Sequence, residues 1–186
     1  MKGLITTLAI CLIAFITNAQ VKFPPLDKSP MDMSCYPSGY PVLKMQGKAT
    51  EPLFARVIYS RPQKNGRAVF GELIEYGKVW RLGANEATEI EFFQNVKIGT
   101  TKVKKGRYTM YCVPYTDKWT LIINKDLDCW GSFTYDVKKD IARIEVPIQK
   151  TTEALDAFTM SFQKLSNGIN LIIAWDNVRV NMPIGL

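Results

Sequence analysis

Residues 106–123 have the sequence GRYTMYCVPYTDKWTLII, and this stretch decides the fold class. Two alternating patterns of side chains run along residues 108–113 and 119–123. A period of two is the spacing of a β-strand with one buried face. Residues 114–118 lie between the two runs and are typical of a short turn. The stretch therefore predicts an antiparallel β-hairpin.

Working outward from this hairpin, the same period of two recurs on both sides. It appears in residues 54–59, 88–92, 142–146, 158–162 and 171–182. The Asn167-Gly168 pair is a strong hairpin signal, and Asp176-Asn177 is expected to join residues 171–175 to residues 178–182 in another hairpin. Short strands separated by turn signals favour an all-β fold, an antiparallel β-sandwich of the jelly-roll or immunoglobulin-like kind.

Two local signals refine this fold. Gly106 followed by Tyr108 at the start of a strand is typical of the tyrosine corner of Greek-key sandwiches. Residues 151–157, with Thr152 as a cap and Glu153 in the first turn, predict one or two turns of helix. We therefore expect at most one or two short helices.

The first 19 residues have the layout of a secretory signal peptide. Lys2 precedes an apolar run of 13 residues, and Ala19 supplies the small residue expected before a cleavage site. The run is shorter than the roughly 20 residues that a membrane-spanning helix needs, although a buried N-terminal helix is an alternative. We expect an exported protein of the periplasm or the extracellular space, with no transmembrane segment in the mature chain.

The rest of the chain is expected to form one domain. Residues 20–41 contain several prolines and predict an extended lead-in, and residues 42–186 predict a single β-sandwich domain. Three cysteines follow the leader. Cys112 and Cys129 could form a disulfide that closes a loop and adds roughly 3 kcal/mol of stability, or they could be buried thiols that pack as small apolar side chains.

Composition excludes several classes of catalyst. The 186 residues include 24 Lys and Arg, 17 Asp and Glu and no His, for a formal net charge of +7. Without His there is no Ser-His-Asp triad, no Cys-His dyad and no His-ligated zinc. The chain has no EF-hand spacing and no phosphate-cradling glycine loop, so we predict neither a metal nor a cofactor.

Residues 61–87 form the longest segment outside the alternating pattern, and long connections of this kind are often functional. Arginine binds carboxylate or phosphate through its planar fork, and tryptophan offers a flat face to a sugar or a cation. We predict that residues 61–88 bind a small polar ligand, such as a carbohydrate, at the cell envelope. The candidate ligand-binding residues are Arg61, Arg67, Trp80, Arg81, Asn85 and Glu86.

Three other interpretations remain open. The loop could be structural, with Trp80 in the core and no small-molecule site. The protein could be a carboxylate-dependent hydrolase of glycans, with Glu86 as the candidate catalytic acid or base and a second carboxylate at Glu72, Glu75, Glu89 or Glu91. The third interpretation is that five basic residues near a predicted turn attract an anionic envelope surface or an acidic polysaccharide. Export of the protein argues against nucleic acid as the partner. The five basic residues are Lys97, Lys102, Lys104, Lys105 and Arg107.

Several motifs resemble those of one bacterial family. They are Tyr59-Ser60-Arg61-Pro62, Gly66-Arg67, Phe70-Gly71, the block YGKVWRLGANEAT at residues 76–88, Gly106-x-Tyr108, Trp119-Thr120 and Trp130-Gly131. The chain resembles domain-of-unknown-function family 2911 over residues 42–184. The resemblance implies an exported protein of Gram-negative bacteria. It implies little about activity, because the family has no established catalytic residues.

Overall fold

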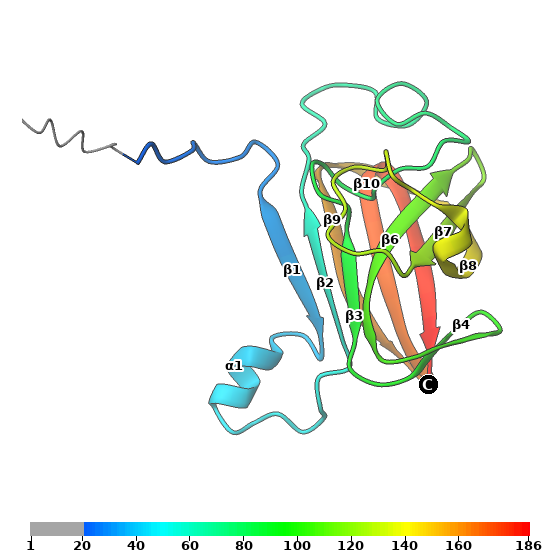
Figure 1. The fold of residues 1–186 in the computed structure, drawn as a ribbon. Coiled ribbons are helices and arrows are strands. Elements are labelled where there is room, and N and C mark those ends of the chain that lie inside the picture. Colours follow the sequence, from blue (N-terminus) through cyan, green and yellow to red (C-terminus); the bar gives the residue numbers. More distant parts are fainter. Residues whose placement is uncertain (1–20) are drawn as a thin grey trace, which may run out of the picture.

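The chain forms two antiparallel β-sheets packed face to face, which confirms the predicted all-β sandwich (Figure 1). The computed structural model describes residues 21–186. The predicted signal peptide, residues 1–19, lies outside the described residues. Within them, no helix combines the length and the hydropathy needed to cross a membrane.

One sheet has six strands, and its spatial order is β1-β2-β3-β6-β7-β8. These strands are β1 (Met31–Tyr36), β2 (Ala55–Ser60), β3 (Glu89–Phe92), β6 (Gly106–Pro114), β7 (Lys118–Asn124) and β8 (Asp140–Pro147). The other sheet has the order β5-β4-β10-β9. Its strands are β4 (Val96–Ile98), β5 (Thr101–Val103), β9 (Gln149–Leu165) and β10 (Gly168–Gly185).

The predicted hairpin at residues 106–123 is formed by β6 and β7. Met110 pairs with Ile123, and Pro114 pairs with Trp119 at the turn. Tyr108 begins this hairpin as a tyrosine corner, since its hydroxyl donates a hydrogen bond of 2.9 Å to the carbonyl oxygen of Lys104, four residues upstream.

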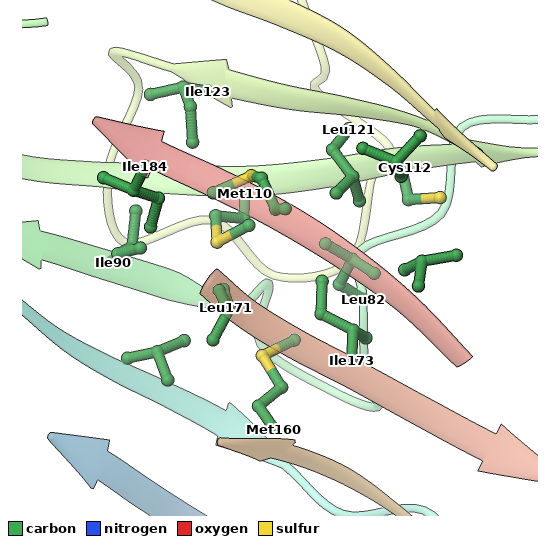
Figure 2. Close-up of a cluster of buried hydrophobic side chains, with 14 of the residues drawn as sticks. Leu82, Ile90, Met110, Cys112, Leu121, Ile123, Met160, Leu171, Ile173 and Ile184 are labelled. Atoms are coloured by element: carbon green, nitrogen blue, oxygen red, sulfur yellow. The ribbon is translucent and has the colours of Figure 1, made fainter. Parts of the chain in front are cut away.

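Strand β10 contains the hairpin predicted around Asp176-Asn177. Asp176 has a left-handed φ of 52°, and the register with β9 shifts on either side of it. The strand folds back there, because a Cβ atom added to Gly168 would lie 2.2 Å from the carbonyl oxygen of Ile184. Figure 2 shows the two arms running in opposite directions, one carrying Leu171 and the other carrying Ile184.

The predicted helix at residues 151–157 is wrong, because this segment belongs to β9. Leu155 of this segment pairs with Asp176 of β10, and Lys150, just before the segment, pairs with Val178. A long partner strand therefore overrides the weak capping signal at Thr152. The short helices lie elsewhere, at α1 (Tyr40–Met45) and the 3₁₀ turn η1 (Val137–Lys139).

Part of the proline-rich lead-in joins the sandwich as an edge strand. Residues 31–36 of it form β1, which pairs antiparallel with β2 and makes one edge of the six-stranded sheet. Met31 lies opposite Ser60 in this pairing. The edge strand brings residues 27–31 beside the end of β2, where part of the candidate site lies.

The core lies between the two sheets. Figure 2 shows Met110 and Leu121 from the six-stranded sheet near Leu171 and Ile173 from the other sheet. Ile90 is fully buried, and Phe92 nearly so, as their alternation with Glu89 and Glu91 predicts. Burial of aliphatic side chains of this size stabilises the fold by about 1.5–3 kcal/mol each.

The three cysteines of the described residues are free thiols, so of the two alternatives for Cys112 and Cys129 the structure shows the unpaired one. Neighbouring residues of β6 face opposite sides of the sheet. Cys112 points into the core, whereas Tyr111 and Val113 point outward into a small second cluster, against which Cys129 packs. The sheet itself separates the two sulfur atoms, and Cys112 packs as a small apolar side chain.

Candidate functional site

The segment predicted to carry the site, residues 61–88, connects β2 to β3 and lies over one end of the sandwich (Figure 1). Trp80 anchors it to the sheet. Its backbone N–H donates to the carbonyl of Cys112 at 2.7 Å, and the N–H of Cys112 donates back to Trp80 at 2.9 Å. This pairing fixes the middle of the loop against β6.

The Trp80 side chain is part of the core rather than of a surface site. Only 4% of it is exposed, and its indole N–H donates to the carbonyl of Gly83 at 3.1 Å. Its ring contacts four other aromatic rings at centroid distances of 5.3–6.2 Å. They are Phe70, Trp119, Phe158 and Trp175. Trp80 therefore cannot stack on a ligand. Its position in the core agrees with the structural interpretation of the loop.

Two of the three candidate arginines form hydrogen bonds within the protein, Arg61 to the neighbouring strands and Arg67 within the loop. Arg61 forms an ion pair with Asp32 at 3.0 Å and also donates to the carbonyl of Phe158. Arg67 donates to the carbonyls of Lys64 and Gln63 at 2.9 and 2.6 Å. Neither arginine lines a hollow together with Glu86.

Arg81 lies in a separate small hollow of about 170 Å³, whose lining also includes Lys78 and Ser132. Burial lowers the pKa of its guanidinium, and its Nε atom is buried without a hydrogen-bond partner among the described residues. Arg81 is therefore not brought together with Glu86.

Asn85 and Glu86 are the two predicted site residues that the fold does bring together. Both line a surface hollow of about 410 Å³ at the end of β2, and Glu86 also lines an adjoining hollow of about 270 Å³. We refer to the two hollows together as the Glu86 groove. Their lining residues are Asp27, Ser29, Met31, Ile58, Ser60, Asn85, Glu86, Ala87, Glu89, Asp128, Cys129 and Trp130.

Trp130 is the aromatic residue of this groove, and the fold places it directly opposite Glu86. The N–H of Ala87 donates to Cys129 at 2.9 Å, and the N–H of Gly131 donates to Asn85 at 2.8 Å. These two bonds flank an antiparallel bridge between Glu86 and Trp130. In a pair flanked in this way the side chains share one face, with Cβ atoms about 4.5–5.5 Å apart.

The indole of Trp130 is available to solvent. It is 61% exposed and stacks on Phe133, which is 81% exposed, at a centroid distance of 5.8 Å and an interplanar angle of 11°. Exposed large aromatic side chains that pack only on one another often mark a binding surface. Here the apolar face adjoins the carboxylate of Glu86.

Glu86 is the carboxylate of the groove that the protein leaves free. Glu89 and Asp128 both pair with Arg107, at 3.5 and 3.0 Å. Asp27 accepts a hydrogen bond of 3.0 Å from the side-chain amide of Asn85. Among the described residues, Glu86 makes no ion pair and no side-chain hydrogen bond.

Sequence reasoning missed Trp130 because it lies in another connection, between β7 and β8. A signal was present in the sequence, since Trp130-Gly131 is one of the motifs by which the chain resembles its family. In the structure Asp128 and Gly131 adopt left-handed φ values of 57° and 70°. No group of three or more metal-ligating side chains occurs within residues 21–186.

Comparison with known proteins gives one result. No curated protein and no solved structure matches the chain. One family model does match, over residues 44–184, in agreement with the resemblance of the loop motifs. The family is described as a protein of unknown function, DUF2911, and the chain belongs to it.

Proposed function

We propose that the protein binds a neutral, hydroxyl-rich small molecule, a carbohydrate, in the Glu86 groove. The observation that supports this most directly is the cross-strand pair of Glu86 and Trp130. The indole supplies an apolar face for the C–H side of a sugar ring, and the carboxylate accepts hydrogen bonds from its hydroxyl groups.

The charge of the groove favours a neutral sugar over an acidic one. Four carboxylates line it, and Arg107 neutralises part of the charge of Glu89 and Asp128 only. An anionic ligand would meet repulsion from Glu86 and Asp27, whereas sugar hydroxyl groups can donate to both. None of the three arginines predicted at the site lines this groove, and Arg81 lies in a separate hollow.

The proposed place of action is the cell envelope. This part rests on the predicted signal peptide, which would export the protein to a compartment where glycans are abundant. A shallow groove of this size suits one or two sugar units rather than a deeply enclosed ligand.

Calorimetric titration with neutral and acidic oligosaccharides tests the proposal. We expect binding of a neutral sugar that falls at least tenfold in Trp130→Ala and in Glu86→Gln. Glu72→Gln is the matched control, because Glu72 is an exposed carboxylate of the same loop outside the groove. If no neutral sugar binds, or if the control variant loses affinity equally, the proposal is wrong and the structural interpretation of the loop is favoured.

A second candidate function is glycan hydrolysis. It is favoured by Glu86 and Glu89 lining one hollow, because glycosidases use a pair of carboxylates. Turnover of chromogenic glycosides that Glu86→Gln abolishes, with the free energy of unfolding unchanged, would support it. Binding without turnover would support the simple binding protein.

A further inference from the structure

Another surface hollow, of about 480 Å³, lies beside the β4–β5 hairpin. We call it the lysine groove. Its lining residues are Asn95, Val96, Lys97, Lys102, Val103, Lys104 and Leu186. Figure 1 shows β4 at the end of the sandwich opposite the long loop that precedes β3, so this groove is separate from the Glu86 groove.

Two of these lysines oppose one another across the hairpin. Lys97 on β4 pairs in register with Lys102 on β5. The alternate residues Val96, Ile98 and Val103 are 3%, 1% and 0% exposed, so both lysines point outward from the same face. Like charges placed directly opposite one another destabilise a strand pair. The Lys97–Lys102 pair is therefore less favourable for the stability of the hairpin than a neutral pair would be.

Within the described residues, no carboxylate lies within ion-pair distance of the lysines of this groove. Lys97, Lys102 and Lys104 make no ion pair there, whereas Lys118 and Lys164 contact carboxylates at 2.8 and 2.6 Å. The fifth basic residue that the sequence grouped with the lysines, Arg107, is not part of this unpaired set, because it pairs with Glu89 and Asp128.

The backbone that carries Lys104 is held in place. Its carbonyl accepts the hydrogen bond from the hydroxyl of Tyr108 at 2.9 Å, and the N–H of Lys105 donates to the side chain of Asn95 at 3.0 Å. The third lysine therefore projects from an anchored turn at the edge of the groove.

We propose that the lysine groove binds a phosphate group, carried either by a soluble compound or by a lipid headgroup. A phosphomonoester has a charge of about −1.5 to −2 and three acceptor oxygens. Three unpaired ammonium groups can supply one donor to each of these oxygens, and a phosphomonoester neutralises up to two of their charges. A single carboxylate would neutralise only one. Lysine binds phosphate as a point charge and requires no fixed donor plane.

The test uses two probes at physiological ionic strength, inorganic pyrophosphate and vesicles that contain phosphatidic acid, whose headgroup is a phosphomonoester. Binding is measured for the unaltered protein, for Lys97→Gln/Lys102→Gln and for the control Lys44→Gln/Lys48→Gln. Both variants replace two lysines with glutamine, so the change in net charge is identical. The control lysines are exposed and lie outside the groove. We expect the groove variant to weaken binding about 25-fold, roughly fivefold for each lysine, and the control to change it less than twofold. The groove variant should remain folded, because it removes a repulsive pair.

Each outcome decides the proposal. Groove-dependent binding of pyrophosphate supports a soluble phosphate ligand, and groove-dependent binding of the vesicles alone supports a lipid headgroup. Binding of neither probe overturns the proposal, as does an equal loss in the control variant. Binding of polygalacturonate without either phosphate probe also overturns it, because the partner would then be an acidic polysaccharide.

Discussion

Trp80 and Trp130 give a direct test of how the loop is built, because the structure assigns them opposite roles. Replacing Trp80 with Ala empties the centre of the aromatic cluster, where its ring contacts four others at 5.3–6.2 Å. Truncation of a buried Trp costs about 3–5 kcal/mol, and the carbonyl of Gly83 loses its partner at a cost of about 1 kcal/mol. We therefore expect Trp80→Ala to lower the free energy of unfolding by about 4–6 kcal/mol, a large part of the total for a domain.

Urea unfolding followed by far-ultraviolet circular dichroism measures this change without relying on tryptophan fluorescence. A loss of this size corresponds to a fall in Tm of roughly 10–20 °C. Trp130→Ala is the matched comparison and should cost less than about 1 kcal/mol, because its ring is 61% exposed. The reasoning is refuted if the two variants cost the same, or if Trp80→Ala unfolds like the unaltered protein but no longer binds ligand.

Three further predictions concern the backbone, pH and the thiols. Gly168→Ala should cost at least about 2 kcal/mol in urea unfolding, because the added Cβ would lie 2.2 Å from the carbonyl oxygen of Ile184 at a φ of 118°; a neutral effect would contradict the folded-back β10. Burial, and then a hydrogen-bonded carboxylate, raises the pKa of Tyr135 to about 12, so its contribution to stability is complete below pH 10 and is lost as the pH rises through 12. Unfolding measured from pH 9 to 12 should show this fall, and Tyr135→Phe should reduce it. In the native protein Cys129 should react with a thiol reagent well before Cys112, whose pKa is raised by burial, and protection of both until reduction would indicate a disulfide.

The strands could be predicted because one buried face imposes a local signal, the period of two. The hairpin at Asp176-Asn177 could be predicted from a second local signal, the turn residues. Asp tolerates the left-handed φ of 52° that the turn needs. Residues 151–157 show where local signals fail. Their capping pattern is compatible with a helix, but the register with β10 decides the outcome, and β10 is distant enough in sequence that no local pattern records it.

The candidate site was only half predictable. Asn85 and Glu86 were found because they lie in the long loop, and that loop also contains Trp80. Which tryptophan is buried depends on what each loop packs against. Trp80 bridges to Cys112 over the core, and Trp130 bridges to Glu86 at the surface. Neither pairing is visible in the spacing of residues along the chain.

The arrangement of charge indicates that the two grooves act independently. Glu89 of the Glu86 groove begins β3, and Asn95 of the lysine groove follows the end of that strand. The six residue steps from Glu89 to Asn95 span up to about 20 Å at roughly 3.3 Å each. The Debye length at physiological ionic strength is only about 8 Å, so salt screens the carboxylates of one end from the lysines of the other. Glu86→Gln should therefore leave pyrophosphate binding unchanged, and Lys97→Gln/Lys102→Gln should leave sugar binding unchanged. Loss of both activities in either variant would mean that the two grooves serve one ligand.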